Sequence, residues 1–502
     1  MAVVSALGSW YFRKRIGQLE EAASNAAETQ RTVLRTLISS AEETEFGRLY
    51  EFHNIKTYDQ FRQNVPLQDY ESLKPYIERL MKGEQNILWH SDINWFAKSS
   101  GTTQDKSKFI PVSFESLEDC HFKGGKDILA WHFQNNPESK IFDGKSLLIG
   151  GSHKINTLAE NSFYGDLSAV LMNNLPFWVN LIKTPNLSIA LMDDWEMKLE
   201  KMALKTMNEN VTNITGVPTW TLVLFDKLLE LTGKKNITEI WPNLELYIHG
   251  GVSFAPYREQ FKRYISNPGM RYLETYNASE GFFGIQTESD VHDMMLMTDY
   301  GIFYEFITMD TVHSENPVVL SLEEVKKDEN YAVVISTNSG LWRYVLGDTI
   351  SFTSLNPFRF TITGRTKLFI NAFGEELVIE NAEKAIAYAC ESSNSRVREY
   401  TAAPIYLDDP ENAGHEWLIE FETIPENLDY FTSQLDKKLK EINSDYEAKR
   451  HKDIALKMPT VKSMPANTFY NWLKQKGKLG GQHKVPRLSN DRKIVNEILE
   501  LI

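Results

Sequence analysis

Residues 114–265 alternate between the hydrophobic patterns of helices and of strands, and this alternation limits the possible folds more than any other feature. Apolar residues at helical spacing predict helices over residues 114–133, with an interruption at Gly124 and Gly125, and over residues 195–207, 219–231 and 256–265. Short apolar runs predict strands over residues 146–151, 214–218 and 244–248. Such alternation favours a largely parallel sheet covered by helices, whose ligands lie beyond the carboxyl ends of the strands.

From residue 271 onward the pattern changes to short strands that follow one another closely. The runs are RYLETY, FFGIQ, GIFYEFI, YAVVIST, LWRYVL, TISF and FRFTIT, which predict a β-rich subdomain. At residues 364–367 the chain turns again, and about 140 residues with mixed helix and strand patterns follow. A chain of 502 residues is too long for one compact core. We therefore expect an α/β protein with a large N-terminal domain over residues 1–363 and a smaller α+β C-terminal domain over residues 364–502.

The net charge limits the kinds of partner that this protein can bind, and the cysteines indicate the cellular compartment. The formal net charge of -14 argues against nucleic acid, which normally requires a basic face. No segment approaches the length of a membrane span, and the basic residues at 13–15 follow the apolar start, the reverse of a signal peptide. Cys120 and Cys390 lie far apart and match no metal-ligand or redox spacing. We expect a cytoplasmic protein without nucleic-acid or membrane partners.

The stretch WFAKSSGTTQDKSKFIPV, residues 95–112, reads as two short strands joined by a polar loop. The loop contains Ser99, Ser100, Thr102 and Thr103 around a glycine, and Lys106 and Lys108 follow. Hydroxyls, free backbone amides and nearby ammonium groups are what a phosphate-binding loop requires. The pattern is not a Walker A loop. An ordinary Ser/Thr/Gly turn between two strands is the structural alternative.

A second candidate is Thr275-Tyr276-Asn277-Ala278-Ser279-Glu280-Gly281, at the end of a predicted strand. A carboxylate such as Glu280 on a strand-end loop is well placed to hold Mg²⁺, which uses one or two protein carboxylates and completes its octahedron with phosphate oxygens and water. Tyr276 could stack on a purine. The same residues would also make an ordinary helix N-cap or turn.

A third candidate is Trp342-Arg343-Tyr344-Val345-Leu346-Gly347-Asp348, interpreted as two strands that meet at a Gly-Asp turn. Asp348 could accept hydrogen bonds from two adjacent hydroxyls, the geometry of a ribose diol. The alternative is an aspartate that only stabilises the turn.

A fourth candidate is the tail GKLGGQHKVPR, residues 477–487. Its glycines allow movement, and Lys478, Lys484 and Arg487 could bring positive charge to a phosphate and withdraw it. The alternative is a solvated basic loop.

The order of these motifs resembles the adenylate-forming superfamily. More closely, the chain is similar to the Gretchen Hagen family of acyl-acid amido synthetases, from about residue 45 to residue 487. The resemblance implies ATP and Mg²⁺ as cofactors, a carboxylic acid and an amino acid as substrates, and a large N-terminal adenylation domain with a mobile C-terminal domain. One departure is that the third motif usually has arginine after its tyrosine, whereas Arg343 precedes Tyr344 here. Any role for this arginine is therefore in doubt.

The resemblance implies a role for each matching residue. Ser99, Ser100, Thr102 and Thr103 would hold the triphosphate; Thr275, Tyr276 and Ser279 would lie by the nucleotide; Glu280 would bind Mg²⁺; Asp348 would take the ribose hydroxyls; Gly250 and Gly251 would lie along the adenine; Arg365 and Lys367 would form the hinge; and Lys484 would be the catalytic lysine.

The implied chemistry has two steps. The enzyme first attaches AMP to a carboxylate and releases pyrophosphate, and an amine then attacks the acyl-adenylate to give an amide. The acyl pocket is expected to draw on the helix after Phe114 and on residues 216–219, and to favour a largely apolar acid. Two alternatives remain: a coenzyme A ligase that uses the same acyl-adenylate, and a non-catalytic nucleotide-binding regulatory protein.

Overall fold

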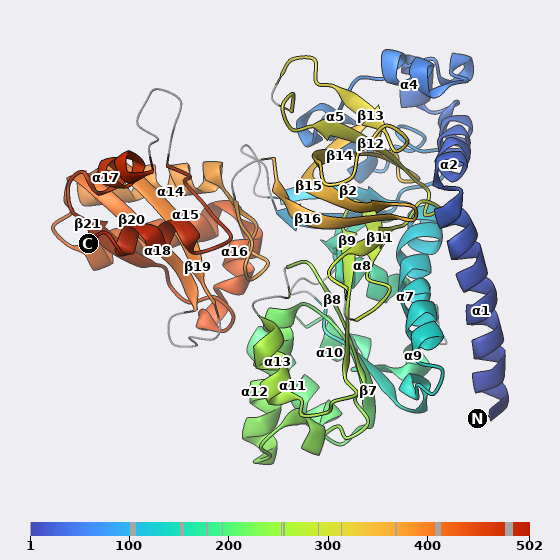
Figure 1. Ribbon diagram of the computed structural model, residues 1–502, viewed down its shortest axis with the longest axis horizontal. Helices are drawn as coiled ribbons and strands as arrows, with labels where there is room; N and C mark the ends of the chain where they lie inside the picture. Colours follow the sequence, from blue (N-terminus) through green and yellow to red (C-terminus); the bar gives the residue numbers. More distant parts are fainter. Residues whose placement is uncertain are drawn as a thin grey trace.

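The computed structural model describes residues 2–100, 107–150, 155–176, 179–192, 194–252, 254, 257–289, 291–312, 314–366, 369–406, 413–476 and 485–502. A large N-terminal part and a smaller C-terminal part lie side by side (Figure 1). The predicted α/β class, with a smaller α+β C-terminal domain, is confirmed. In the part of the chain that is described, no helix is both long enough and apolar enough to cross a membrane.

One half of the main sheet is parallel, as the strand and helix alternation over residues 114–265 predicts, but its last strand comes from the segment predicted as a β-rich subdomain. Its strands are β6 (Lys183–Thr184), β3 (Lys145–Leu148), β7 (Val211–Thr215), β8 (Leu246–Gly250) and β9 (Arg271–Ala278), in that spatial order. Three amphipathic helices follow these strands in the chain: α11 (Trp195–Thr206), α12 (Pro218–Thr232) and α13 (Arg258–Tyr264). Aromatic and aliphatic residues of the strands and helices form one buried core.

The other half of the same sheet is antiparallel. It is made by β10 (Gly281–Ile285), β11 (Met294–Leu296), β16 (Phe358–Arg365), β15 (Tyr344–Leu355), β14 (Asn330–Thr337), β12 (Ile302–Thr308) and β13 (Val319–Ser321), in that order outward from β9. The β-rich segment therefore extends the parallel sheet instead of forming a sheet of its own. The change of direction at β9 puts the carboxyl end of β8 beside the turn between β9 and β10.

A second, four-stranded sheet carries the predicted phosphate loop. Its order is β2 (Ser107–Val112), β1 (Trp95–Ser100), β5 (Ser162–Asp166) and β4 (Asn156–Ala159). The two strands predicted on either side of the polar loop are confirmed, because β1 and β2 pair as an antiparallel hairpin.

The long helices of the N-terminal half lie on the side of the molecule that faces away from the C-terminal part (Figure 1). The long ones are α1 (Ala2–Ser24), α2 (Ala26–Ala41), and α6 (Phe114–Ser116), which continues through the π-helical η2 (Leu117–His121) into α7 (Phe122–Asn135). Shorter ones are α3 (Glu45–Leu49), η1 (Phe52–Asn54), α4 (Tyr58–Asn64), α5 (Tyr70–Met81), η3 (Ile141–Asp143), α8 (Leu167–Asn174), α9 (Val179–Ile182), α10 (Leu187–Ala190) and η4 (Ile237–Glu239).

The predicted interruption at Gly124 and Gly125 is wrong, because α7 runs through both glycines. A Cβ atom on Gly124 would lie 2.6 Å from the ring of Phe282. This glycine therefore allows the helix to approach the sheet closely, and packing outweighs its low helix propensity.

The C-terminal part has a three-stranded sheet in the order β19 (Arg396–Ile405), β20 (Gly414–Thr423) and β21 (Thr460–Met464). The remaining elements are β17 (Phe369–Ile370), β18 (Leu377–Val378), α14 (Ile379–Ser393), α15 (Leu428–Ile442), α16 (Ser444–Lys449), η6 (His451–Asp453), α17 (Thr468–Gln475) and α18 (Lys493–Leu499). Helices α14 and α15 share a buried core with this sheet. The exact boundary at residue 364 stays a prediction.

Candidate active site

The carboxyl ends of β8 and β9 bring two predicted segments together. Gly250 pairs with Thr275 in parallel register, and the Thr275 hydroxyl donates a hydrogen bond to the carbonyl of His249 at 3.2 Å. A Cβ atom on Gly250 would lie 2.5 Å from the carbonyl oxygen of Thr275, so only glycine fits there. Gly251 follows at a φ of +81°, which other residues rarely adopt. Neither glycine adds a side chain of its own at this end of β8, which leaves backbone along which a planar ring could lie.

Ser279 and Glu280 form the two-residue turn between β9 and β10, since Ala278 pairs with Gly281. Burial raises the pKa of Glu280 above its ordinary value, while nearby Lys108 on β2 opposes the shift. In the described residues no group of three or more His, Cys, Asp or Glu side chains is placed to hold a metal. A partly buried single carboxylate suits Mg²⁺ when phosphate oxygens and water supply the other ligands.

Asp348 does not lie in a turn between two strands. The predicted Gly-Asp turn is therefore wrong. It lies within β15, where Gly347 has a φ of +92° and the register against β14 shifts. The shift is a β-bulge, which re-aims a side chain without ending the strand. Across the other strand pair, Asp348 faces Arg365 on β16.

The carboxylate of Asp348 already has a partner on each oxygen. Arg365 Nε donates to Oδ1 at 2.7 Å, and the Tyr276 hydroxyl donates to Oδ2. The Arg365 guanidinium also reaches Glu376 at 3.5 Å. Burial raises the pKa of Tyr276, and the charge of Asp348 raises it further, so Tyr276 remains a donor. Each carboxylate oxygen keeps lone pairs that could accept further hydrogen bonds from a ligand.

The ring of Tyr276 is buried. Its centroid lies 4.8 Å from that of Phe283 and 6.1 Å from that of Phe360. The structure thus gives this tyrosine a role in fixing Asp348, and its stacking on a purine stays a prediction.

The β1–β2 hairpin brings Ser99 opposite Lys108 and Ser100 opposite Ser107. Thr102, Thr103 and Lys106 of the predicted phosphate loop lie outside the described residues, as do Lys367 and Lys484. Arg487 is described, and it pairs with Glu399 and lies over the ring of Tyr400 at 4.6 Å. This arginine, which sequence analysis made part of a mobile cationic tail, is held within its own domain.

Arg343, whose role the sequence left in doubt, is buried away from these groups. Its Nε and one terminal nitrogen donate to Glu305 at 2.8 to 3.1 Å, and the other terminal nitrogen donates to the carbonyls of Arg62 and Val65. Glu305 also accepts from Tyr58 at 3.1 Å. Arg343 therefore ties the segment before α5 to the sheet and is structural.

Sequence analysis missed a group of charged side chains where the two parts of the protein meet. Ser444 at the start of α16 contacts Ser107 of β2 at 3.2 Å, and Asn371 donates to the carbonyl of Gly251 at 3.2 Å. On α16, burial raises the pKa of Asp445 to about 7, Glu376 and Asp166 add to this, and Lys449 and Lys98 oppose it. These groups come from four distant segments, so no local motif could reveal them.

We expect Asp445→Asn to reduce the pH dependence of stability. The folded state binds this proton more tightly than the unfolded chain, so the stabilisation it provides is lost as the pH rises through about 7. Between pH 6 and pH 8 the wild type should lose about 1 kcal/mol more than the variant, which stays neutral. Urea unfolding at both pH values measures this, with the exposed Asp92→Asn as control. Equal losses in wild type and Asp445→Asn would contradict the assignment.

Known proteins match this chain over nearly its whole length. The GH3 family N-terminal domain matches residues 15–270, its central domain residues 295–365 and its C-terminal domain residues 380–493. Indole-3-acetic acid-amido synthetase GH3.3 of Arabidopsis thaliana is 22% identical, over 94% of this chain and 91% of the relative. Jasmonoyl--L-amino acid synthetase JAR4 of Nicotiana attenuata is 24% identical, over 94% of this chain and 92% of the relative.

Two solved structures share the fold. The AtGH3.15 acyl acid amido synthetase in complex with 2,4-DB aligns with a TM-score of 0.63 at 18% identity, over 97% of this chain and 95% of the other. A 2-hydroxyisobutyryl-CoA ligase in the thioesterification state aligns with a TM-score of 0.59 at 14% identity, over 96% and 94%.

Proposed function

The chain belongs to the GH3 family, and on that premise we propose that it is a ligase that adenylates a carboxylic acid and transfers the acyl group to an amino acid. Both relatives described above are named for joining an acid to an amine or amino acid. The observation that carries the proposal is the convergence of Tyr276, Asp348 and Arg365 beside the turn that bears Glu280.

In this proposal ATP binds beside the carboxyl ends of β8 and β9, within reach of Asp348 on β15. Asp348, fixed by Tyr276 and Arg365, accepts from the ribose hydroxyls, while Gly250 and Gly251 lie along the adenine. Thr275 and Ser279 line the nucleotide. Ser99, Ser100, Thr102 and Thr103 hold the triphosphate. Glu280 would hold Mg²⁺, which would offset negative charge on the phosphates.

The two proposed steps follow from the chemistry of the carboxylate. A carboxylate oxygen is a poor leaving group, so the substrate carboxylate attacks the α-phosphate of ATP, and pyrophosphate leaves. The amino acid then attacks the acyl carbon through its amine, AMP leaves, and the amine loses a proton. Neither step needs a covalent enzyme nucleophile. For the acid we propose an apolar compound in a pocket that draws on α7 and on residues 216–219.

Lys484→Ala is expected to slow pyrophosphate release by about 10²–10³-fold, the usual effect of losing one donor aimed at developing charge. By the family pattern, this lysine stabilises negative charge on the α-phosphate during adenylation. Pre-steady-state pyrophosphate release from MgATP and the acid measures it, with Lys478→Ala on the same tail as control. Unchanged release in Lys484→Ala would remove this lysine from the mechanism.

We also propose that residues 364–502 rotate between the two steps. The hinge would be residues 365–367, and Lys484 would serve the first step and withdraw for the second. Arg365 supports this, because one guanidinium contacts Asp348 on the N-terminal side and Glu376 on the C-terminal side. Separately, we propose a cytoplasmic location, which the two separated cysteines suggest.

A coenzyme A ligase is the second candidate function, because such an enzyme has the same fold at a TM-score of 0.59. The two activities separate at the second step. Pre-formed acyl-adenylate on the enzyme is mixed with coenzyme A or with amino acids, and the product is identified by mass spectrometry. An amide with an amino acid supports the proposed function. A thioester, with no amide, would assign the protein to the coenzyme A ligases.

A further inference from the structure

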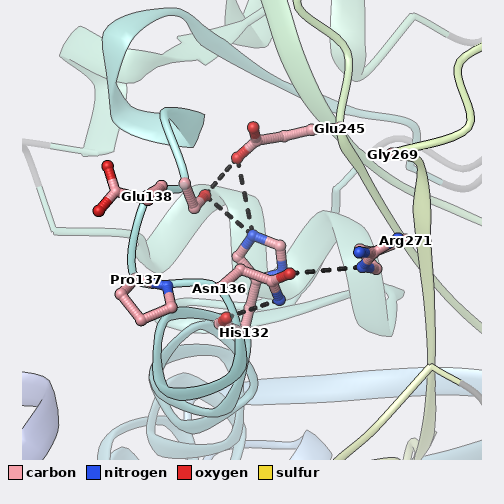
Figure 2. Close-up of a pocket in the computed structure, with 8 residues that line it drawn as sticks. His132, Asn136, Pro137, Glu138, Glu245, Gly269 and Arg271 are labelled. Carbon is pink, nitrogen blue, oxygen red and sulfur yellow. Dashed lines mark hydrogen bonds and ion pairs between the residues drawn. The ribbon is translucent and has the colours of Figure 1, made fainter.

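A cavity of about 290 Å³ lies at the opposite ends of the two strands that lead to the candidate active site (Figure 2). Glu245 directly precedes β8, and Arg271 is the first residue of β9. The last residue of β9 before its turn is Ala278, seven residues from Arg271, so the cavity lies about 20 Å from that turn along the strand. The third wall is the end of α7 and the chain that follows it, with His132 and Asn136.

One side of the cavity is a cation with unused donors. Arg271 Nε donates to Asn136 Oδ1 at 3.3 Å. Within the described ranges, Arg271 has no carboxylate within ion-pair distance, and no acceptor lies on its two terminal nitrogens. The Asn136 side chain is itself fixed, because its Nδ2 donates to the carbonyl of His132 at 3.0 Å. The terminal fork of a guanidinium fits a carboxylate with two parallel hydrogen bonds.

On the other side of the cavity lies a carboxylate with one oxygen held by hydrogen bonds and the other able to accept more. Glu245 Oε1 accepts from the hydroxyl of Ser139 and from the backbone N–H of Lys140, whereas Oε2 accepts nothing from the part of the chain that is described. Burial alone would raise the pKa of Glu245, but hydrogen bonds from Ser139 and Lys140 and the nearby His132 ring, at 3.7 Å, lower it below the ordinary value. Glu245 is therefore ionised at neutral pH.

A buried imidazole lies between the two charges. Figure 2 shows His132 with Glu245 on one side and Arg271 on another. The His132 side chain is only 2% exposed; its Nε2 contacts the Ser139 hydroxyl at 2.9 Å, and its Nδ1 has no partner in the described chain. A buried, unpartnered nitrogen costs free energy unless a ligand or water satisfies it.

We propose that this cavity is a second binding site for a free α-amino acid, remote from the reaction centre. The α-carboxylate pairs with the terminal nitrogens of Arg271, and the α-ammonium pairs with Glu245 Oε2. A small zwitterion presents both charges and suits a volume of about 290 Å³. The choice of an amino acid over other zwitterions rests on the proposed function, in which an amino acid is the second substrate.

The position of the cavity suits regulation of that function. Strand β8 pairs with β9 along the whole length of β8, from Leu246 opposite Arg271 to Gly250 opposite Thr275. Any shift of β9 against β8 at the cavity therefore changes the close contact between Gly250 and the Thr275 carbonyl at the other end. α7 offers a second connection, because His121, directly before its first residue, contacts Asn277 at 3.0 Å.

Isothermal titration of the full chain without ATP tests the site. Glycine, L-alanine, L-serine and L-aspartate are titrated one at a time, together with glycinamide, which lacks the carboxylate, and acetate, which lacks the ammonium. At least one of the amino acids is expected to bind, and neither analogue should. Arg271→Met should weaken that binding by about 10- to 100-fold, the usual effect of losing a bidentate charged pair.

Arg263→Met, which changes an exposed arginine on α13, is the matched control and should bind as the wild type does. If Arg271→Met does not fold, Arg271→Lys provides the same test, because it keeps the charge and loses the fork; it should also weaken binding. Absence of binding by all four amino acids, or unchanged binding in the Arg271 variant, would overturn the site. Pyrophosphate release measured separately decides the proposed function, and its absence in the wild type would leave this binding result standing.

Discussion

Asp348→Ala is expected to lower kcat/KM for pyrophosphate release by about 10²–10⁴-fold. In the proposed complex this carboxylate accepts charge-assisted hydrogen bonds from both ribose hydroxyls, and each such bond contributes about 1.5–3 kcal/mol. The substitution also removes the acceptor of the Tyr276 hydroxyl and one of the partners of Arg365. Release from MgATP with an accepted carboxylic acid measures the loss.

The ribose assignment can be separated from a merely structural role with altered nucleotides. The wild type should use 2′,3′-dideoxyATP far less well than ATP, whereas Asp348→Ala should use both equally poorly. Asp293→Ala is the matched control, because Asp293, directly before β11, forms a similar pair with Arg359 of β16 at 2.7 Å. A variant that still prefers ATP over the dideoxy analogue as strongly as the wild type does would refute the assignment of Asp348.

Arg343→Met is expected to lower the free energy of unfolding of the N-terminal part by about 3–5 kcal/mol, since it leaves a buried carboxylate without its partner. The Arg343 and Glu305 side chains are only 5% and 1% exposed, and three of the arginine nitrogens make hydrogen bonds. The loss follows from desolvation of Glu305 and from the carbonyls of Arg62 and Val65 that lose their donor. Urea unfolding followed by tryptophan fluorescence measures it.

Two further variants make this prediction specific. Arg31→Met breaks an exposed pair with Glu323 and should cost less than 1 kcal/mol. Glu305→Leu combined with Arg343→Met removes both buried charges and should be more stable than Arg343→Met alone. If Arg343→Met were no more destabilising than Arg31→Met, the ion pair would not have the structural role described for it.

The sequence predicted those features that depend on local pattern. Helical and strand periodicity predicted β3, β7 and β8 and the helices α12 and α13, because parallel strands are continuous apolar runs separated by amphipathic helices. It also predicted a strand at β9, but as part of the β-rich segment, whereas β9 is parallel to β8. Short apolar runs next to polar residues likewise predicted the β1–β2 hairpin and the position of Glu280 at the end of a strand.

Features that depend on contacts between distant segments could not be predicted. Gly347 and Asp348 have the composition of a turn, and only pairing with β14 and β16 makes them a bulge inside one strand. Gly124 has the composition of a helix break, yet it lies where α7 must pass close to Phe282. Asp445 and Lys449 gain their neighbours only when the C-terminal part packs against β1 and β5.

The hydrogen bonds that Asp348 already accepts from Tyr276 and Arg365 could not be predicted from the sequence either. Its motif and that of Tyr276 are separated by about 70 residues, and a hydrogen bond between two predicted site residues leaves no local signal. The structure adds that these residues are not independent. Any substitution of Tyr276 or Arg365 changes the position of the Asp348 carboxylate.

Pyrophosphate release from MgATP tests the central claim most directly. The wild-type chain is assayed against a panel of aryl, indole and fatty carboxylic acids, each with and without a mixture of amino acids. The proposed function predicts release that requires one of the acids and becomes faster with an amino acid. No release with any acid, by protein that still binds ATP, would contradict the claim and favour a nucleotide-binding regulatory protein.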